Sequence, residues 1–407
     1  MLETGTRLDL KIEDVAYRGP GIARHEGLVI FVDRVAPGER VEAEITASKK
    51  NFAEARVVRL LEPSPHRIPP CTRDAEGVSL PGCVYDFLAY PAEVEIKHRQ
   101  MLGLLRQVPG IQEAALPPFA SPSDLKYRNK IVLHVQRAGR EPARIGYYSD
   151  DNRTVVDIER CPLACDAINY AWAARRDAAR RTLENGQRIT LRWTPADGVA
   201  SWVDQAPESA PMLTEESPVG PLKVPLDGFF QVNTAVAGEL VRQVREWYAR
   251  AAEESGTRHL LDLYCGVGVF ALAGAADGAA PVAGFESVRP AIAAARQNSR
   301  ALGQAATFHC ARVEEAARTG FGDLDLSRYL VIADPPRQGL EPNVVDTLGN
   351  GRVPHLIYAA CDPATLARDV KRLASFGYRL RAARMLDMFP RTRHFETAVW
   401  LSLGCPA

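Results

Sequence analysis

The feature that most constrains the fold is a short apolar run that ends in two closely spaced glycines. Residues 260–264 (LLDLY) are typical of a buried strand, and Gly266 and Gly268 follow before an apolar segment with helical spacing. A second apolar run, Pro281 to Phe285, ends at Glu286, twenty residues after Gly266. Glycines at such a turn let the backbone approach a ligand, and an acid at that distance accepts hydrogen bonds from ribose hydroxyls. The pattern predicts an α/β domain of the Rossmann type that binds a nucleotide-like cofactor.

Two neighbouring features favour S-adenosylmethionine over a nicotinamide dinucleotide as that cofactor. Asp262 lies inside the first strand close to the turn, where a carboxylate suits a cationic ligand better than a pyrophosphate. A further strand, Tyr329 to Ala333, runs into Asp334 and two prolines, a rigid end suited to holding a polar planar substrate. The glycine turn and Glu286 alone also fit NAD, so an NAD-dependent dehydrogenase stays open as the alternative to a methyltransferase.

A candidate nucleophile follows another strand-like run. Residues 356–360 (LIYAA) precede Cys361, Asp362 and Pro363 stop the strand, and a helical pattern begins at Ala364. This arrangement exposes a thiol at the carboxyl edge of a sheet, where open α/β folds bind their ligands. We expect the start of the helix to lower the pKa of the thiol and so to favour the reactive thiolate.

Composition indicates a large globular protein without a strong overall field. The 407 residues include 50 basic and 50 acidic side chains, so a nucleic-acid site has to be a local patch. The sequence has no apolar run long enough for a bilayer and no signal-peptide pattern at its start. Its eight cysteines are too sparse and uneven for a disulfide scaffold. We therefore expect a cytoplasmic protein, without a membrane partner and monomeric.

Residues 1–62 are predicted to form a small β-barrel. Strand-like segments alternate with glycine and proline turns, a spacing typical of oligonucleotide-binding barrels. Four cations are candidates for phosphate contacts: Lys49, Lys50, Arg18 and Arg24. The run Arg18-Gly-Pro-Gly-Ile-Ala-Arg24, the strand that ends at Val32 and the turn Pro-Gly-Glu39 together resemble the TRAM domain, an RNA-binding barrel. The resemblance implies that this module binds RNA.

Residues 63–225 are predicted to form a strand-rich RNA-binding domain, and residues 226–407 the Rossmann-like domain. A helix is expected from Val94 to Val108, and an arginine-rich helix from Asp166 to Leu183 interrupts the strands. The run Tyr127-Arg128-Asn129-Lys130 opens the first of these strands with an aromatic and two cations. It is a candidate RNA contact, and an ordinary solvated strand start is the alternative.

The C-terminal motifs, taken together, resemble the S-adenosylmethionine-dependent RNA 5-methyluridine methyltransferases that carry a TRAM domain. Each motif alone is weak, but the order and spacing make the set specific, and with the barrel the resemblance covers essentially the whole chain. The motifs are Phe-Phe-Gln231-Val-Asn233, Asp262-Leu-Tyr264-Cys-Gly266-x-Gly268, Glu286, Asp334-Pro-Pro-Arg337-x-Gly339, Cys361-Asp-Pro-Ala-Thr365 with Arg368-Asp369, and His394-Phe395-Glu396-Thr397.

The resemblance implies covalent catalysis on a uracil base. Carbon 5 of uracil is too weakly nucleophilic to attack a methyl sulfonium unaided, and a thiolate that adds to carbon 6 activates it. By resemblance Cys361 is this nucleophile and Glu396 is the general base; the alternative for Glu396 is a surface carboxylate paired with Arg393. The target base would be flipped out of the RNA. The residues expected around S-adenosylmethionine are Gln231, Tyr264, Gly266, Glu286 and Asp334.

The resemblance leaves the RNA substrate open and raises the question of an iron–sulfur cluster. Relatives with a TRAM-like start often act on 23S ribosomal RNA, which we prefer, with the thymine-loop uridine of transfer RNA as the alternative. The family commonly holds a cluster on four cysteines; here Cys71, Cys83 and Cys161 match, but Leu80 stands at the remaining position. Cluster irons need four thiolates, so Cys165 would have to be recruited, and remnants of a lost site are the preferred interpretation.

Overall fold

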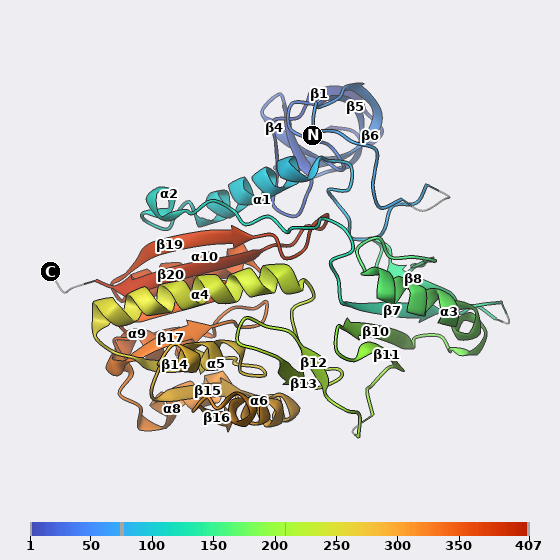
Figure 1. The fold of residues 1–407 in the computed structure, drawn as a ribbon. Helices are drawn as coiled ribbons and strands as arrows, with labels where there is room; N and C mark the ends of the chain where they lie inside the picture. The colour runs from blue at the N-terminus through green and yellow to red at the C-terminus, as the bar shows by residue number, and fades with distance from the viewer. Residues whose placement is uncertain (1, 74–76, 140, 208, 405–407) are drawn as a thin grey trace.

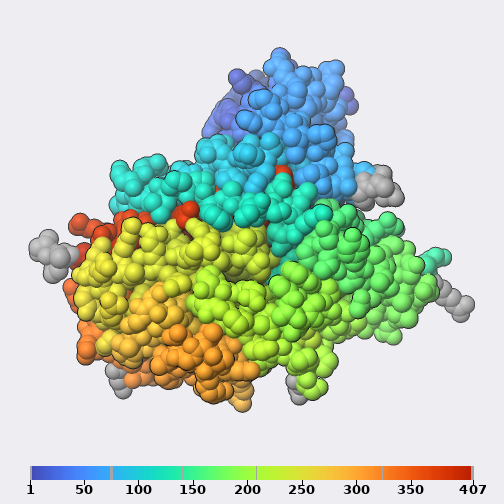
Figure 2. Space-filling view, viewed as in Figure 1, coloured from blue at the N-terminus to red at the C-terminus, as the bar shows by residue number. Residues whose placement is uncertain are grey.

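The computed structural model describes residues 2–73, 77–139, 141–207 and 209–404 (Figure 1). Three large sheets dominate it: one of six strands, one of five and one of seven. The six-stranded sheet stands out above the rest of the molecule, and the five-stranded sheet forms a lobe at one side (Figures 1 and 2). None of the helices in the described ranges is long and apolar enough to cross a membrane.

The N-terminal module is a curled six-stranded sheet. Its strands are β1 (Arg7–Lys11), β2 (Asp14–Val15), β3 (Gly21–His25), β4 (Leu28–Val32), β5 (Arg40–Ser48) and β6 (Phe52–Glu62), in the order β1-β5-β6-β4-β3-β2. Alternate side chains of β5, such as Val41, Ala43 and Ile45, are fully buried, as a strand with one face on a core requires. The predicted β-module is confirmed.

The five-stranded antiparallel sheet occupies the middle of the chain. It consists of β7 (Lys130–Gln136), β8 (Arg144–Tyr148), β9 (Val155–Asp157), β10 (Arg188–Thr194) and β11 (Gly198–Val203), in the order β11-β10-β7-β8-β9. Helix α3 (Asp166–Thr182) buries Trp172 against this sheet, and Leu80, Cys83 and Cys161 belong to the same apolar core. The small hairpin of β12 (Leu213–Glu215) and β13 (Leu222–Val224) connects this lobe to the C-terminal sheet.

The C-terminal sheet has the arrangement that the glycine turn predicts. Its strands are β14 (His259–Leu263), β15 (Val282–Glu286), β16 (Thr307–Cys310), β17 (Tyr329–Ala333), β18 (His355–Ala360), β19 (Tyr378–Leu386) and β20 (Glu396–Leu403), in the order β16-β15-β14-β17-β18-β20-β19. The first five are parallel, and β20 runs antiparallel to β18. The strand order reverses between β14 and β17, and open α/β sheets bind their ligands at the carboxyl ends of the strands at such a point. This is a Rossmann-like methyltransferase fold.

Helices cover both faces of this sheet. One face carries α4 (Thr234–Ser255), α5 (Val269–Ala276) and α6 (Arg289–Leu302). The other face carries α1 (Tyr90–Leu105), α7 (Val313–Arg318), α9 (Pro342–Asn350) and α10 (Pro363–Ala374). Figure 1 shows α4 in front of the sheet and α1 between the sheet and the N-terminal module. Three short helices complete the fold: α2 (Ile111–Ala114), α8 (Gly320–Asp323) and η1 (Leu326–Arg328).

The placement of α1 corrects the predicted domain division. Val94, Met101 and Leu105 of α1 are buried in the core of the C-terminal sheet, and the segment after α1 runs beside β19, with Ala115 bridged to Ala383. Residues 63–225 are therefore not one packing unit. The apolar spacing of a helix shows that one of its faces is covered, but it carries no information about which sheet covers it.

Candidate active site

The parallel strands bring the predicted site residues to one edge of the C-terminal sheet. Tyr264 follows β14, Glu286 ends β15, Asp334 follows β17 and Cys361 follows β18. Because β20 is antiparallel, its first residue, Glu396, lies at the same edge. The sequence motifs of five strands and their connections thus converge where the fold type places its ligands.

The register between β18 and β20 sets Cys361 against Glu396. Ala360 pairs with Thr397, so continuing the antiparallel register by one residue places Cys361 opposite Glu396. Directly opposed residues of antiparallel strands have their Cα atoms about 4.5–5.5 Å apart. The two predicted catalytic side chains are therefore neighbours, although 34 residues separate them in sequence.

The carboxylate of Glu396 is buried and unpaired. Both of its oxygens lack a hydrogen-bond partner among the described residues. Burial raises the pKa of Glu396 well above its usual value, and the nearby charge of Asp334 adds to the effect, whereas Arg337 opposes it. The alternative of a surface carboxylate paired with Arg393 is wrong. A buried acid without a partner is costly to the fold, which makes Glu396 a candidate for a functional role.

The pKa of the Cys361 thiol is raised on balance, although the thiol precedes helix α10. Burial raises the pKa of the half-buried Cys361 thiol to about 11, with a further contribution from Glu396, although Arg337 lowers it. The first amide groups of α10 bind a carboxylate: Asp362 Oδ1 accepts from the N–H groups of Ala364 (2.9 Å) and Thr365 (3.3 Å). These amide groups are therefore occupied by the N-cap residue of the helix.

The glycine turn after β14 is shaped by its neighbours. Gly268 has φ +92°, and a Cβ atom there would lie 3.0 Å from the ring of Phe308, so glycine is required. The Gly266 N–H donates to Glu286 Oε2 (3.3 Å), and the Val288 N–H donates to Glu286 Oε1 (2.8 Å). These bonds fix the carboxylate of Glu286 beside the turn.

Two acids near this turn have raised pKa values. Asp262 is fully buried; one oxygen accepts from the Ala271 N–H (2.8 Å), and the other has no partner among the described residues. Burial raises the pKa of Asp262 to about 8 and that of Asp334 to about 7. A cationic ligand without phosphates suits such a group of acids, and S-adenosylmethionine carries positive charge on its sulfonium and ammonium groups. The residues present therefore fit this cofactor.

The other two expected cofactor residues lie at the border of the site. The half-buried Tyr264 has φ +62° and donates its hydroxyl to Glu314 Oε1 (2.9 Å). Gln231 is half-buried in the segment before α4, two residues ahead of Asn233, the N-cap of that helix. The Asn233 side chain donates to the carbonyl oxygen of Met388 (3.4 Å). This bond brings the Gln231 segment to residues 387–395, the chain that leads into Glu396.

The loop that follows Asp334 is fastened to helix α10. Asp369 Oδ2 accepts from the Leu340 N–H and from the Tyr358 hydroxyl, both at 2.8 Å. Arg368 donates to the carbonyl oxygen of Gln338 (2.7 Å). Gly339 has φ +77°, and a Cβ atom there would lie 2.4 Å from Asp369 Oδ2. The loop and the turn at Cys361 therefore keep a fixed relative position.

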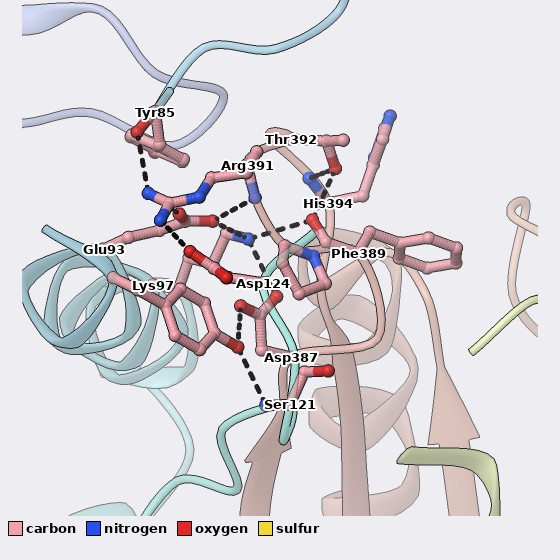
Figure 3. Close-up of polar contacts among 12 residues, drawn as sticks. Tyr85, Glu93, Lys97, Ser121, Asp124, Asp387, Phe389, Arg391, Thr392 and His394 are labelled. Atoms are coloured by element: carbon pink, nitrogen blue, oxygen red, sulfur yellow. Dashed lines mark hydrogen bonds and ion pairs between the residues drawn. The ribbon is translucent and has the colours of Figure 1, made fainter. Parts of the chain in front are cut away.

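A buried ion cluster lies behind the chain that leads into Glu396 (Figure 3). Lys97 Nζ contacts Glu93 Oε1 (2.7 Å) and Asp387 Oδ1 (2.8 Å), and all three side chains are fully buried. The Arg391 N–H donates to Glu93 Oε1 (2.6 Å), and its guanidinium group pairs with Asp124. The cluster joins α1 to residues 387–391. Sequence reasoning missed it, because its members lie almost 300 residues apart and no local pattern links them.

The expected RNA contact at the start of β7 has a different role. The Tyr127 hydroxyl donates to the carbonyl oxygen of Pro390 (3.0 Å), and Arg128 Nε donates to Tyr127 (3.4 Å). Both side chains are half-buried between the middle lobe and the chain that leads into Glu396. Of the four candidate barrel cations, Lys49 and Lys50 are exposed, Arg24 pairs with Glu13 (3.4 Å) and Arg18 pairs with Asp362 (3.8 Å).

The structure distributes the cysteines of the predicted cluster region over different surroundings. Cys83 and Cys161 are buried in the apolar core that contains Leu80, and burial raises the pKa of Cys83 to about 12. Cys71 and Cys165 are only half-buried. Within the described ranges, no three or more His, Cys, Asp or Glu side chains are grouped so that they could hold a metal ion.

Comparison with known proteins agrees with the fold. Residues 222–403 match the family model of tRNA (uracil-5-)-methyltransferases, and residues 2–58 match the TRAM domain. The chain is 31% identical to a 23S rRNA (uracil(1939)-C(5))-methyltransferase RlmD of Pectobacterium atrosepticum, covering 93% of this chain and 90% of that one. It is 33% identical to the protein of the same name from Acidithiobacillus ferrooxidans, covering 95% of each chain.

A solved structure has the same architecture over nearly the whole chain. The tRNA (uracil-54, C5)-methyltransferase of Pyrococcus abyssi, in complex with S-adenosyl-L-homocysteine, matches 97% of this chain and 100% of its own with a TM-score of 0.73 at 24% identity. The fold and site define an S-adenosylmethionine-dependent methyltransferase. Within that class, this chain belongs to the RNA uracil-C5 methyltransferases with a TRAM domain. This assignment decides against the NAD-dependent dehydrogenase.

Proposed function

We propose that this protein methylates carbon 5 of a uridine in 23S ribosomal RNA, with Cys361 as nucleophile and Glu396 as general base. The register that sets Cys361 against a buried, unpaired Glu396 carries the mechanistic part. The two relatives named as 23S rRNA methyltransferases support the choice of RNA. The thymine-loop uridine of transfer RNA is the alternative, because the tRNA enzyme of Pyrococcus abyssi shares the architecture.

The proposed chemistry begins at carbon 6 of the uracil ring. The Cys361 thiol gives up its proton to solvent, its thiolate sulfur forms a bond to carbon 6, and the ring electrons move to the oxygen on carbon 4 as an enolate. When bound, S-adenosylmethionine supplies a methyl group on a sulfonium, which carbon 5 accepts. Glu396 then removes the proton from carbon 5, the double bond between carbons 5 and 6 is restored, and the Cys361 thiolate is expelled. Every electron pair is accounted for, and the products are 5-methyluridine and S-adenosylhomocysteine.

Five residues would hold the cofactor at this edge of the sheet. The carboxylate of Glu286, which two backbone N–H groups hold in place, suits the ribose hydroxyls. Gly266 has no side chain that would keep the cofactor away from the backbone of the turn. The raised pKa of Asp334 indicates a site that gains from a bound cation, and this carboxylate would also face the uracil edge. The set is Gln231, Tyr264, Gly266, Glu286 and Asp334. The cytoplasmic, monomeric state stays a prediction.

A trapping experiment with RNA that contains 5-fluorouridine tests the mechanism and the substrate together. Fluorine on carbon 5 cannot leave as a proton does, so the enzyme should stall as a complex that survives denaturation. We expect wild type to form this complex with 23S ribosomal RNA when S-adenosylmethionine is added, and Cys361→Ala to form none. Cys310→Ala removes an exposed thiol on β16 and should behave as wild type.

The outcomes of this experiment separate the parts of the proposal. A complex with transfer RNA alone would replace the ribosomal substrate and keep the mechanism. A complex that persists in Cys361→Ala would exclude Cys361 as the nucleophile. Methylation at carbon 5 without any trapped complex would contradict covalent catalysis.

A further inference from the structure

We infer that the turn between β2 and β3 of the N-terminal module forms one wall of the active site, and that Arg18 on this turn binds a backbone phosphate of the RNA beside the target uridine. The inference rests on the proposed function and adds a substrate-positioning residue from a part of the chain far from the catalytic motifs. The turn comprises residues 16–20.

The turn contacts the residues next to Cys361 and Glu396 in sequence. Arg18 Nη2 lies 3.8 Å from Oδ2 of Asp362, the residue that follows Cys361. The Tyr17 ring meets the ring of Phe395 edge to face, with 6.0 Å between centroids, and Phe395 immediately precedes Glu396. Burial raises the pKa of Tyr17 to about 12, and the charges of Asp362 and Cys361 contribute. One turn of the barrel therefore contacts the neighbours of both proposed catalytic residues.

The turn is held in this position from behind. The side-chain amide of Gln100 on α1 donates to the carbonyl oxygens of Val15 (3.2 Å) and Ala16 (2.8 Å). Within the turn, the Gly19 N–H donates to Ala16 O (3.0 Å) and the Ala16 N–H to Pro20 O (2.8 Å). These bonds fix the backbone, so Tyr17 and Arg18 keep their place at the site.

The Arg18 side chain is exposed and is only weakly paired with a carboxylate. Its side chain is 63% exposed, and 3.8 Å is long for a charge-assisted hydrogen bond. Asp362 is an incomplete partner, because its other oxygen caps α10. The backbone of Arg18 has φ +78°, a left-handed conformation that an arginine adopts at a cost. An exposed ion pair stabilises a protein too little to explain that conformation.

The charges of the site explain why a cation is needed at this point. The interior is acidic, because the buried Asp262 and Glu396 both lie near the half-buried Asp334. That interior suits a cationic cofactor but repels the phosphates on either side of a flipped uridine. A guanidinium group at the rim, next to Asp362, offsets this repulsion and can bind a phosphate through two N–H groups.

Arg18→Ala and a matched control test the inference. Arg7 is the control, because it lies on β1 of the same module, is 59% exposed and also pairs with carboxylates at 3.8 Å, those of Glu42 and Glu44. We expect Arg18→Ala to raise KM for the RNA about tenfold and to reduce the salt dependence of RNA binding by about one counterion. KM for S-adenosylmethionine and the thermal unfolding temperature should not change. Arg7→Ala should stay within about twofold of wild type in every quantity.

Three results would overturn the inference. The first is an Arg18→Ala variant that equals Arg7→Ala in KM for RNA and in salt dependence. The second is a loss confined to kcat, or to folding stability, which would make Arg18 a structural partner of Asp362. The third is full rescue by Arg18→Gln, which keeps hydrogen-bonding groups without charge. A wild-type protein that methylates neither RNA would instead reject the proposed function, so the two failures are distinguishable.

Discussion

Two groups of buried carboxylates flank the chain that leads into Glu396, and they differ in their partners. Behind this chain, Glu93 and Asp387 share Lys97 at 2.7 and 2.8 Å. At the sheet edge, both oxygens of Glu396 and one of Asp262 have no partner among the described residues. The carboxylates of the first group both contact a lysine, whereas those oxygens of the second group have no hydrogen-bonded cation in the described ranges, although the charge of Arg337 acts on Glu396.

The difference separates structure from function in residues of the same type. Burial lowers the pKa of Lys97, but Asp387 and Glu93 together outweigh it and raise the pKa above its usual value, so the lysine stays charged. Burial raises the pKa of Glu93 to about 7, although Lys97 lowers it. At the sheet edge, burial raises the pKa of Glu396 well above its usual value, and Arg337 opposes the shift only in part. A buried acid without a partner weakens the fold, and proteins retain such groups where a ligand supplies the missing charge.

Replacement of Glu396 by glutamine should separate activity from stability most clearly. We expect Glu396→Gln to slow release of the methylated RNA by about 10²–10⁴-fold and to accumulate the methylated covalent adduct, because the proton on carbon 5 loses its base. The free energy of unfolding should stay the same or rise, because the buried negative charge is removed. Single-turnover release of methylated RNA and urea unfolding measure the two quantities. A variant that unfolds easily would show that Glu396 is a structural residue.

Removal of Lys97, which Glu93 and Asp387 share, should lower stability. Lys97→Met leaves Glu93 and Asp387 buried without their cation and should lower the free energy of unfolding by about 3–5 kcal/mol. Urea unfolding with wild type alongside measures this loss. The triple variant Lys97→Met/Glu93→Gln/Asp387→Asn removes the charges together and should recover part of it. No recovery would mean that Lys97 acts by packing and not by charge.

The acids at the sheet edge should also make stability depend on pH, with a smaller effect than the substitutions above. The pKa values of Asp262, about 8, and Asp334, about 7, lie above the usual value near 4, so the folded state binds more protons than the unfolded state between those limits. Stability without cofactor should therefore fall as pH rises from 5 to 8. We expect Asp262→Asn to remove part of this pH dependence. The loss of unfolding free energy between pH 5 and 8 should become smaller by an amount on the order of 2 kcal/mol.

The control for this measurement is an acid with the opposite shift. Arg372 lowers the pKa of Asp346, which therefore titrates below pH 5, so Asp346→Asn should keep the wild-type slope between pH 5 and 8. Urea unfolding at several pH values gives the slopes of all three proteins. Equal slopes in wild type and Asp262→Asn would show that Asp262 is not the titrating group.

The strand ends of the C-terminal sheet were predictable from sequence because they are local. A buried strand followed by glycines, by Asp334 or by Cys361 is visible within ten residues, and the parallel order then brings these ends together. The state of the thiol was not predictable. Its pKa depends on its burial in the folded protein and on Glu396, which comes from another strand.

Long-range partners escaped the sequence for the same physical reason. The pairing of Lys97 with Asp387, and of Arg18 with Asp362, joins side chains whose positions follow only from tertiary packing. The helical spacing after residue 90 indicated a covered face, but a helix packed on β19 and a helix packed on the middle sheet have the same spacing. The predicted domain limit failed for this reason.

Helix α1 fixes the position of the N-terminal barrel turn relative to the segment that precedes Glu396. Lys97 holds the chain that leads into Glu396, and Gln100, three residues later on the same helix, holds the barrel turn that carries Arg18. An added or deleted residue between them would rotate one anchor by about 100° around the helix axis relative to the other. One turn of helix α1 therefore couples the orientation of the barrel to that of the catalytic sheet.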